Sequence, residues 1–212
     1  MSARTPDPPL LGERFDEAIR YAVDHHRTQL RKGTQIPYVA HILAVASIAL
    51  EIGDSEDEAI AALLHDVVED GGGVDALVEI KDCFGAPVAA MVEANSDSVA
   101  QPKPPWEERK RAYVGSIAAK DPAAVRVSIA DKLHNARSIL SDLERHGDSL
   151  WTRFRTDRDG VLWYYGALVG AFDARRPEIG EAACSALDEL IRVVGAIRAE
   201  AIVTSRFPPA YG

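Results

Sequence analysis

The sequence has little of several features on which particular protein classes depend. Cysteine occurs only twice among the 212 residues, at Cys83 and Cys184, without the close spacing of a metal-binding pair. We therefore expect free or buried thiols and a reducing, cytoplasmic setting. The longest mostly apolar stretch, residues 42–50, is too short to cross a bilayer, so we expect no membrane partner.

The residues that favour β-sheets are also sparse. Aromatic residues make up 7 % of the chain, and alternating runs rich in Val, Ile and Thr are rare, whereas alanine is abundant. This composition predicts an all-α fold. The length suits one substantial hydrophobic core, and no shift in composition divides the chain. We predict a single domain over residues 1–212, with residues 1–11 and 204–212 as loose tails.

The net charge of −9 limits the choice of partner. An acidic chain repels the phosphate backbone of nucleic acids, so we expect no nucleic-acid partner. A small anionic ligand is compatible with this charge, because local basic residues and a metal ion decide how such a ligand binds. The sequence leaves the oligomeric state open, with an oligomer as one alternative.

Hydrophobic periodicity, prolines and glycines divide the chain into segments. The most regular apolar stripe runs through Val125, Ile129, Leu133, Ala136, Leu140 and Leu143. We expect a loop over 96–106, which contains three prolines, and a new helix opening at 107–111. The other predicted helices cover 13–31, 38–52, a span from Asp54 or Ser55 to Asp70, 75–84, 87–95, 159–172 and 178–202.

The segment AIAALLHDVVED, residues 59–70, has the most unusual pattern in the chain. Its first half is apolar on every side, which is typical of a buried helix. His65, Asp66, Glu69 and Asp70 follow, and residues three and four apart share one face of a helix. Burying ionised carboxylates is costly unless something neutralises them. A bound cation at the end of this predicted helix resolves the conflict.

Further residues could complete such a cation site. His41, His65, Asp66 and Asp131 supply two imidazoles and two carboxylates from three predicted helices. This mixture of nitrogen and oxygen donors suits manganese, iron or zinc. An adjacent His-Asp pair alone is weak evidence, since such pairs also occur on surfaces. Its apolar context favours the metal interpretation.

Glu69 and Asp70 lie close to the predicted ligands and could accept a proton from an attacking water. The alternative is a solvated helix end, although acids at a helix C-terminus oppose the helix dipole. Basic residues at Arg27, Arg31, Lys32, Lys103 and 109–111 could bind phosphates, or simply be solvated. Tyr38 and Trp163 could stack on a base or pack in the core.

Three motifs in this order, RTQLRKGTQIPYVAHIL, AALLHDVVED and IADKLHNARSI, resemble those of the HD-domain hydrolases. More narrowly, they resemble the hydrolase domain of the RelA/SpoT alarmone enzymes and the small alarmone hydrolases. The likeness covers residues 14–172 and includes MVEANSDS followed by ERKR. It implies an HD-domain helical bundle and a Mn²⁺-dependent enzyme. The implied reaction removes the 3′-pyrophosphate from guanosine tetra- or pentaphosphate, a small phosphorylated nucleotide.

The resemblance also implies roles for individual residues. The matched metal ligands are His41, His65, Asp66 and Asp131. The matched pair that handles the attacking water is Glu69 and Asp70, and the substrate-binding matches are Arg31, Lys32, Tyr38 and Asn135. Ile42 stands where the family usually has proline, and the chain beyond Trp163 matches poorly.

Three other functions remain open at this stage. An HD-domain phosphohydrolase could act on another nucleotide, such as a nucleoside monophosphate or the 2′-phosphate of NADPH. A sensor could keep the metal and bind a nucleotide without cleaving it, although the Glu69-Asp70 pair argues against this. A purely structural helical scaffold would bind no metal.

Overall fold

The structure is a computed structural model that describes residues 10–98 and 102–206. Within these ranges it contains ten α-helices and no β-strand, and a single isolated bridge joins Leu30 to Pro37. The all-α prediction is therefore confirmed. The helices are α1 (Glu13–His25), α2 (Val39–Ile52), α3 (Glu56–Leu64), α4 (Gly73–Phe84), α5 (Ala86–Asn95), α6 (Trp106–Ser116), α7 (Pro122–His146), α8 (Arg158–Asp173), α9 (Arg176–Ile179) and α10 (Glu181–Arg206).

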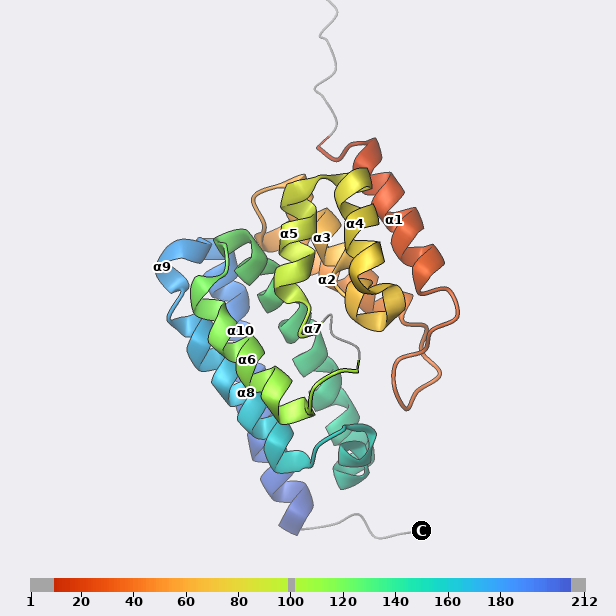
Figure 1. The fold of residues 1–212 in the computed structure, drawn as a ribbon. Coiled ribbons are helices and arrows are strands. Elements are labelled where there is room, and N and C mark those ends of the chain that lie inside the picture. The colour runs from red at the N-terminus through yellow and green to blue at the C-terminus, as the bar shows by residue number, and fades with distance from the viewer. Residues whose placement is uncertain (1–9, 99–101, 207–212) are drawn as a thin grey trace, which may run out of the picture.

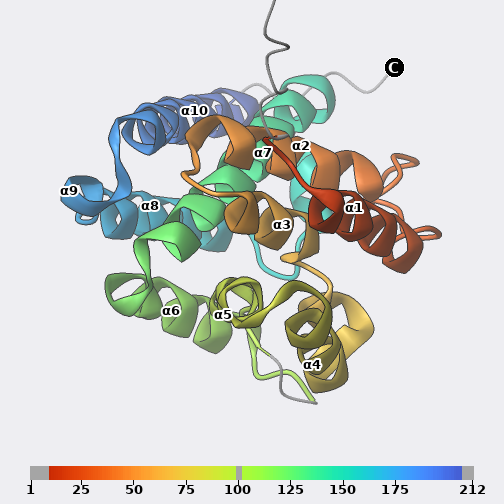
Figure 2. The same cartoon turned by 90° about the horizontal axis from the view of Figure 1, so that it is seen from above.

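Helix α7 runs through the middle of the bundle (Figure 1). It packs against α2, α3 and α5 in the first half of the chain and against α10 in the second half, as the view from above also shows (Figure 2). Its apolar stripe has the predicted periodicity, with Ile129, Leu133 and Leu143 fully buried and Leu140 half-buried. The interior therefore forms around the helix that carries Asp131.

The first helix is shorter than the predicted 13–31, because it ends at His25. The chain then folds back on itself. The backbone N–H of Tyr38 donates to the carbonyl of Gln29, and that of Arg31 donates to the carbonyl of Ile36. Gly33, with φ of 72°, allows the reversal. The basic residues from Arg27 to Lys32 consequently lie on a loop that leads into α2.

The third helix ends at Leu64, so the prediction that it continues to Asp70 is wrong. Residues 65–67 form a turn, and a π-helical turn, η1 (Val68–Gly72), follows. Asp70 has non-helical angles (φ −94°, ψ 35°), and Gly71 has φ of 116°. The glycine run makes this departure from the helix inexpensive. The face expected to join Asp66 to Glu69 and Asp70 is therefore not a regular helical one.

Other boundaries differ near glycines and at the tails. Gly180, with φ of 82°, separates α9 from α10, so the predicted helix 178–202 is two helices. Helix α10 continues through Arg206, past the predicted tail start at 204. The described parts of the 96–106 loop, 96–98 and 102–105, contain no helix. Residues 1–9, 99–101 and 207–212 lie outside the described structure. None of the described helices is long and apolar enough to span a membrane.

Candidate functional site

The four predicted ligands meet where α2, α3 and α7 come together. His41 lies in the first turn of α2, His65 and Asp66 lie in the turn after α3, and Asp131 lies on α7. Ligand atoms of His41, His65 and Asp66 all lie within 4.8 Å of one another. The Oδ1 atom of Asp131 lies 3.4 Å from His41 Nε2 and 3.6 Å from His65 Nε2. The structure thus brings all four side chains into one group.

The donor atoms of this group fit a divalent cation. His65 Nδ1 lies 2.7 Å from the carbonyl oxygen of Ala62, which can only accept, so Nδ1 donates there and Nε2 is the ring nitrogen that faces the carboxylates. That Nε2 is buried and has no hydrogen-bond partner among the described residues. It lies 2.9 Å from Asp66 Oδ2. A ring nitrogen this close to carboxylates needs a proton or a metal ion between them, and a metal ion that replaces the proton would have four donor side chains around it, which makes this a candidate metal site.

The charges around the site keep both carboxyl groups ionised. Burial alone would raise the pKa of Asp66, but His65 and His41 hold it well below its usual range. Burial acts in the same direction on Asp131, and there Lys132 is the strongest influence that lowers the pKa. Burial would lower the pKa of His65, yet Asp66 and Asp131 raise it well above its ordinary value. The two ionised carboxylates therefore depend on neighbouring positive charge, which a bound metal ion would also supply.

Neighbouring side chains orient the candidate ligands. The hydroxyl of Tyr38 donates to Asp66 Oδ2 at 2.6 Å, and the ammonium of Lys132 donates to Asp131. Asn135 also donates to Asp131, and its own oxygen accepts from Arg31 at 2.9 Å. Such outer contacts fix the direction in which a ligand oxygen points. Sequence reasoning gave Lys132 no role, although its position directly after Asp131 was a signal.

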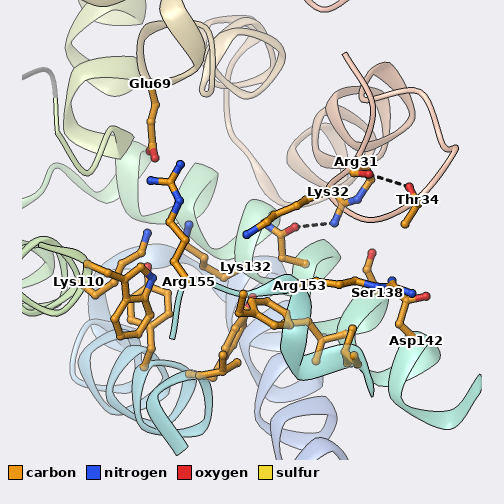
Figure 3. Close-up of a pocket in the computed structure, with 18 of the residues that line it drawn as sticks. Arg31, Lys32, Thr34, Glu69, Lys110, Lys132, Ser138, Asp142, Arg153 and Arg155 are labelled. Atoms are coloured by element: carbon orange, nitrogen blue, oxygen red, sulfur yellow. Dashed lines mark hydrogen bonds and ion pairs between the residues drawn. The ribbon is translucent and has the colours of Figure 1, made fainter. Parts of the chain in front are cut away.

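A cavity of about 420 Å³ opens beside this centre (Figure 3). Arg31 and Lys32 lie on one side of it and Lys110 on the other. Among the described lining residues, eight are cationic and three are carboxylates. The cationic residues are Arg31, Lys32, Lys103, Arg109, Lys110, Lys132, Arg153 and Arg155. The predicted substrate residues Tyr38 and Asn135 line it as well, so the four predicted substrate residues share one pocket.

Glu69 and Asp70 both line the cavity, but they bind different partners. Glu69 lies 3.4 Å from the ammonium of Lys103 and 3.9 Å from the guanidinium of Arg109. Asp70 accepts a hydrogen bond from Gln29 at 2.7 Å. Burial raises the pKa of both acids, aided at Glu69 by Asp97 and at Asp70 by Asp66. A raised pKa makes a carboxylate a stronger proton acceptor near neutral pH.

Some residues considered from the sequence lie away from the cavity. Arg27 pairs with Asp24 on the surface, and Trp163 packs against the guanidinium of Arg111. Neither Arg27 nor Trp163 lines the cavity, so they are poor candidates for contacts with a ligand there. Conversely, Arg153 and Arg155 line it although the sequence gave them no role. They come from the segment after α7, where sequence periodicity was uninformative.

Comparisons with known proteins identify the family of this chain and several relatives. The family model described as "HD domain" matches residues 18–162. The guanosine-3′,5′-bis(diphosphate) 3′-pyrophosphohydrolase MESH1 of Drosophila melanogaster is 37 % identical over 149 residues, which are 68 % of this chain and 78 % of that protein. The enzyme of the same name from Homo sapiens is 38 % identical over 142 residues, 66 % of this chain and 74 % of the relative.

A solved structure of another protein is similar to this one over most of the length of both chains. It is described as a metazoan orthologue of SpoT that hydrolyses ppGpp and plays a role in starvation responses. The two folds share a TM-score of 0.69 with 27 % sequence identity, over 90 % of this chain and 99 % of the other. The matched family model, these relatives and the helical bundle agree: the chain belongs to the HD-domain family.

Proposed function

We propose that this protein is a metal-dependent hydrolase that removes the 3′-pyrophosphate from guanosine 3′,5′-bispyrophosphate and its pentaphosphate form. The observation that carries the proposal is the pair of imidazoles and pair of carboxylates that converge beside a basic cavity. The relatives named for this reaction support the choice of substrate.

In this proposal His41, His65, Asp66 and Asp131 hold the metal ion. We assign Mn²⁺, because mixed imidazole and carboxylate donors suit a first-row divalent ion and the alarmone hydrolases resembled by the motifs use manganese. A divalent ion in such a site polarises a phosphoryl oxygen and makes water more acidic. Tyr38 and Lys132 then keep the carboxylates of Asp66 and Asp131 directed at the centre.

Glu69 and Asp70 take the proton of the attacking water, since both line the cavity and burial raises the pKa of both. Arg31 and Lys32 bind the phosphate groups of the nucleotide, and Asn135 contacts the substrate beside Asp131. Tyr38 lines the same cavity and completes the substrate-binding set.

We propose a cytoplasmic location, which suits two cysteines that are both free. The partner is a small phosphorylated nucleotide and not a nucleic acid, because the basic residues gather in a cavity while the chain as a whole is acidic. The helices around α7 share one hydrophobic core, which supports a single domain.

A nucleotide panel tests this function. Purified protein with Mn²⁺ is incubated with ppGpp, pppGpp, a nucleoside monophosphate and NADPH, and released pyrophosphate is measured separately from phosphate. Release of pyrophosphate from ppGpp and pppGpp is the expected result. Binding of ppGpp without release would favour a sensor, and phosphate release from another nucleotide would favour a different substrate.

A further inference from the structure

Gln29 connects the loop after α1 to the acid pair. Its side-chain amide donates to Asp70 Oδ2 at 2.7 Å, and its side-chain oxygen lies 2.6 Å from Nδ1 of His26. This is the one hydrogen bond to the Asp70 carboxylate from the described residues. Asp70 belongs to η1, so the contact joins segments 41 positions apart in the chain.

The direction of these hydrogen bonds follows from the chemistry of the groups. A carboxylate can only accept, so the NH₂ group of Gln29 must face Asp70 and its oxygen must face His26. Nδ1 of His26 therefore has to carry the proton. His26 is fully buried, and its Nε2 has no partner among the described residues. In the neutral tautomer with the proton on Nδ1, Nε2 is an unpaired acceptor, and the burial of an unpaired N–H donor is avoided.

Contacts with Tyr38 hold His26 and Gln29 in place, whereas the side chain of Asp70 is exposed. The His26 ring packs against Tyr38, with ring centroids 5.0 Å apart, and the carbonyl of Gln29 accepts from the backbone of Tyr38. Asp70 precedes Gly71, and a side chain at Gly71 would find no neighbour within 4 Å. The backbone N–H of Asp70 donates to the carbonyl of Asp66 at 2.8 Å, so the backbone is held while the orientation of the carboxylate depends on Gln29.

We propose that His26 and Gln29 are positioning residues for Asp70, an inference that rests on the proposed function. Gln29 holds one oxygen of Asp70 and leaves the other for the water that attacks. His26 prevents the Gln29 amide from turning over, which would direct its oxygen at the carboxylate. A misplacement of about 1 Å in a reacting group can reduce turnover about 100-fold, so this support matters for the rate.

A double-mutant cycle tests the proposal. Gln29→Met keeps the length of the side chain and removes both hydrogen bonds, so we expect kcat for ppGpp to fall about 10- to 100-fold. We expect KM, metal content and melting temperature to change little. In an Asp70→Asn background, Gln29→Met should lower kcat by less than about twofold. An equal loss of kcat in both backgrounds would overturn the proposal, as would an Asp70→Asn variant with normal turnover.

Matched variants separate positioning from general damage. Gln35→Met is the same substitution at an exposed position of the same loop, and wild-type turnover is expected. His26→Asn retains a donor near the position of Nδ1, whereas His26→Gln moves it toward Nε2. His26→Asn should therefore retain more kcat than His26→Gln, and the opposite order would contradict the proposed hydrogen bond.

The tautomer of His26 can be measured without any substrate. Long-range ¹H–¹⁵N NMR correlation on the wild-type protein should show the proton of His26 on Nδ1, and a proton on Nε2 would refute the arrangement. If the wild-type protein releases no pyrophosphate from ppGpp, the proposed function fails while this measurement still decides the hydrogen-bond geometry.

Discussion

The hydroxyl of Tyr38 offers a precise way to test the metal centre without altering any candidate ligand. It donates to Asp66 Oδ2 at 2.6 Å, while the ring packs against His26 and His41 with centroid distances of 5.0 and 5.4 Å. Tyr38→Phe removes the oxygen and keeps the ring. The buried Asp66 carboxylate then loses a donor that fixes its direction.

The size of the effect follows from the strength of that bond. A hydrogen bond to a charged acceptor contributes about 1.5–3 kcal/mol. Since each 1.4 kcal/mol is about a factor of ten in affinity, the affinity for Mn²⁺ should fall about 10- to 100-fold. Turnover at saturating Mn²⁺ should recover in part, because the ion still binds when its concentration is high.

Calorimetric titration with Mn²⁺, or competition with a chelator, measures this affinity directly. Tyr21→Phe is the matched control. The Tyr21 hydroxyl donates to Glu79 with an oxygen–oxygen distance of 2.8 Å, and neither residue lines the cavity. The control should bind Mn²⁺ like the wild-type protein. An affinity of Tyr38→Phe within about twofold of wild type would refute the reasoning, as would an equal loss in Tyr21→Phe.

Three further predictions address the same centre and its surroundings. Asp131→Ala should lose both bound metal and turnover, whereas Asp142→Ala, in the same cavity, should retain metal; unchanged metal content in Asp131→Ala would contradict the assignment. Glu69→Gln should keep the metal and lower turnover about 10²–10⁴-fold, and near-normal turnover would move the proton-accepting role elsewhere. Burial, together with Lys132, lowers the pKa of Lys120 to about 7 in the folded protein, whereas the pKa of an unperturbed lysine is about 10.4. Between these two pH values the unfolded chain therefore binds more protons than the folded protein does. From pH 7 to 9 the free energy of unfolding of the wild-type protein should therefore rise by about 2 kcal/mol more than that of Lys120→Met. Denaturant titrations measure both values, and a difference between the two proteins that does not change with pH would refute the burial argument.

The elements with a regular apolar period were predictable from the sequence. The stripe on α7 is an example, because Ile129, Leu133 and Leu143 are buried at the spacing that the sequence shows. Burial of one helical face depends mainly on local sequence, which is why this prediction succeeded. The all-α class followed from the same signal.

The ends of helices were harder to predict, because long-range contacts and backbone geometry decide them. The end of α1 at His25 depends on the hydrogen bond from Tyr38 to Gln29, nine positions apart. The end of α3 depends on the turn at His65 and on the positive φ of Gly71. A helical pattern contains neither piece of information.

The same distinction applies to the candidate site. His41, His65, Asp66 and Asp131 could be selected together because their chemistry conflicts with the apolar sequence around them. Gln29 and Arg153 could not, because neither is unusual in its local sequence. Their importance arises only from contacts formed on folding, such as the hydrogen bond between Gln29 and Asp70.

The proposed function requires an acidic chain to bind a small anion, and the basic lining of the cavity explains how it can. Surface charges beyond about 10 Å are largely screened at cellular salt concentrations, so the overall charge of −9 has little effect inside the cavity. A small anion that enters the cavity is exposed to nearby groups such as Arg31, Lys32 and Lys110. Under the proposed function, binding of a small anion therefore depends on the local placement of charge and not on the net charge of the chain.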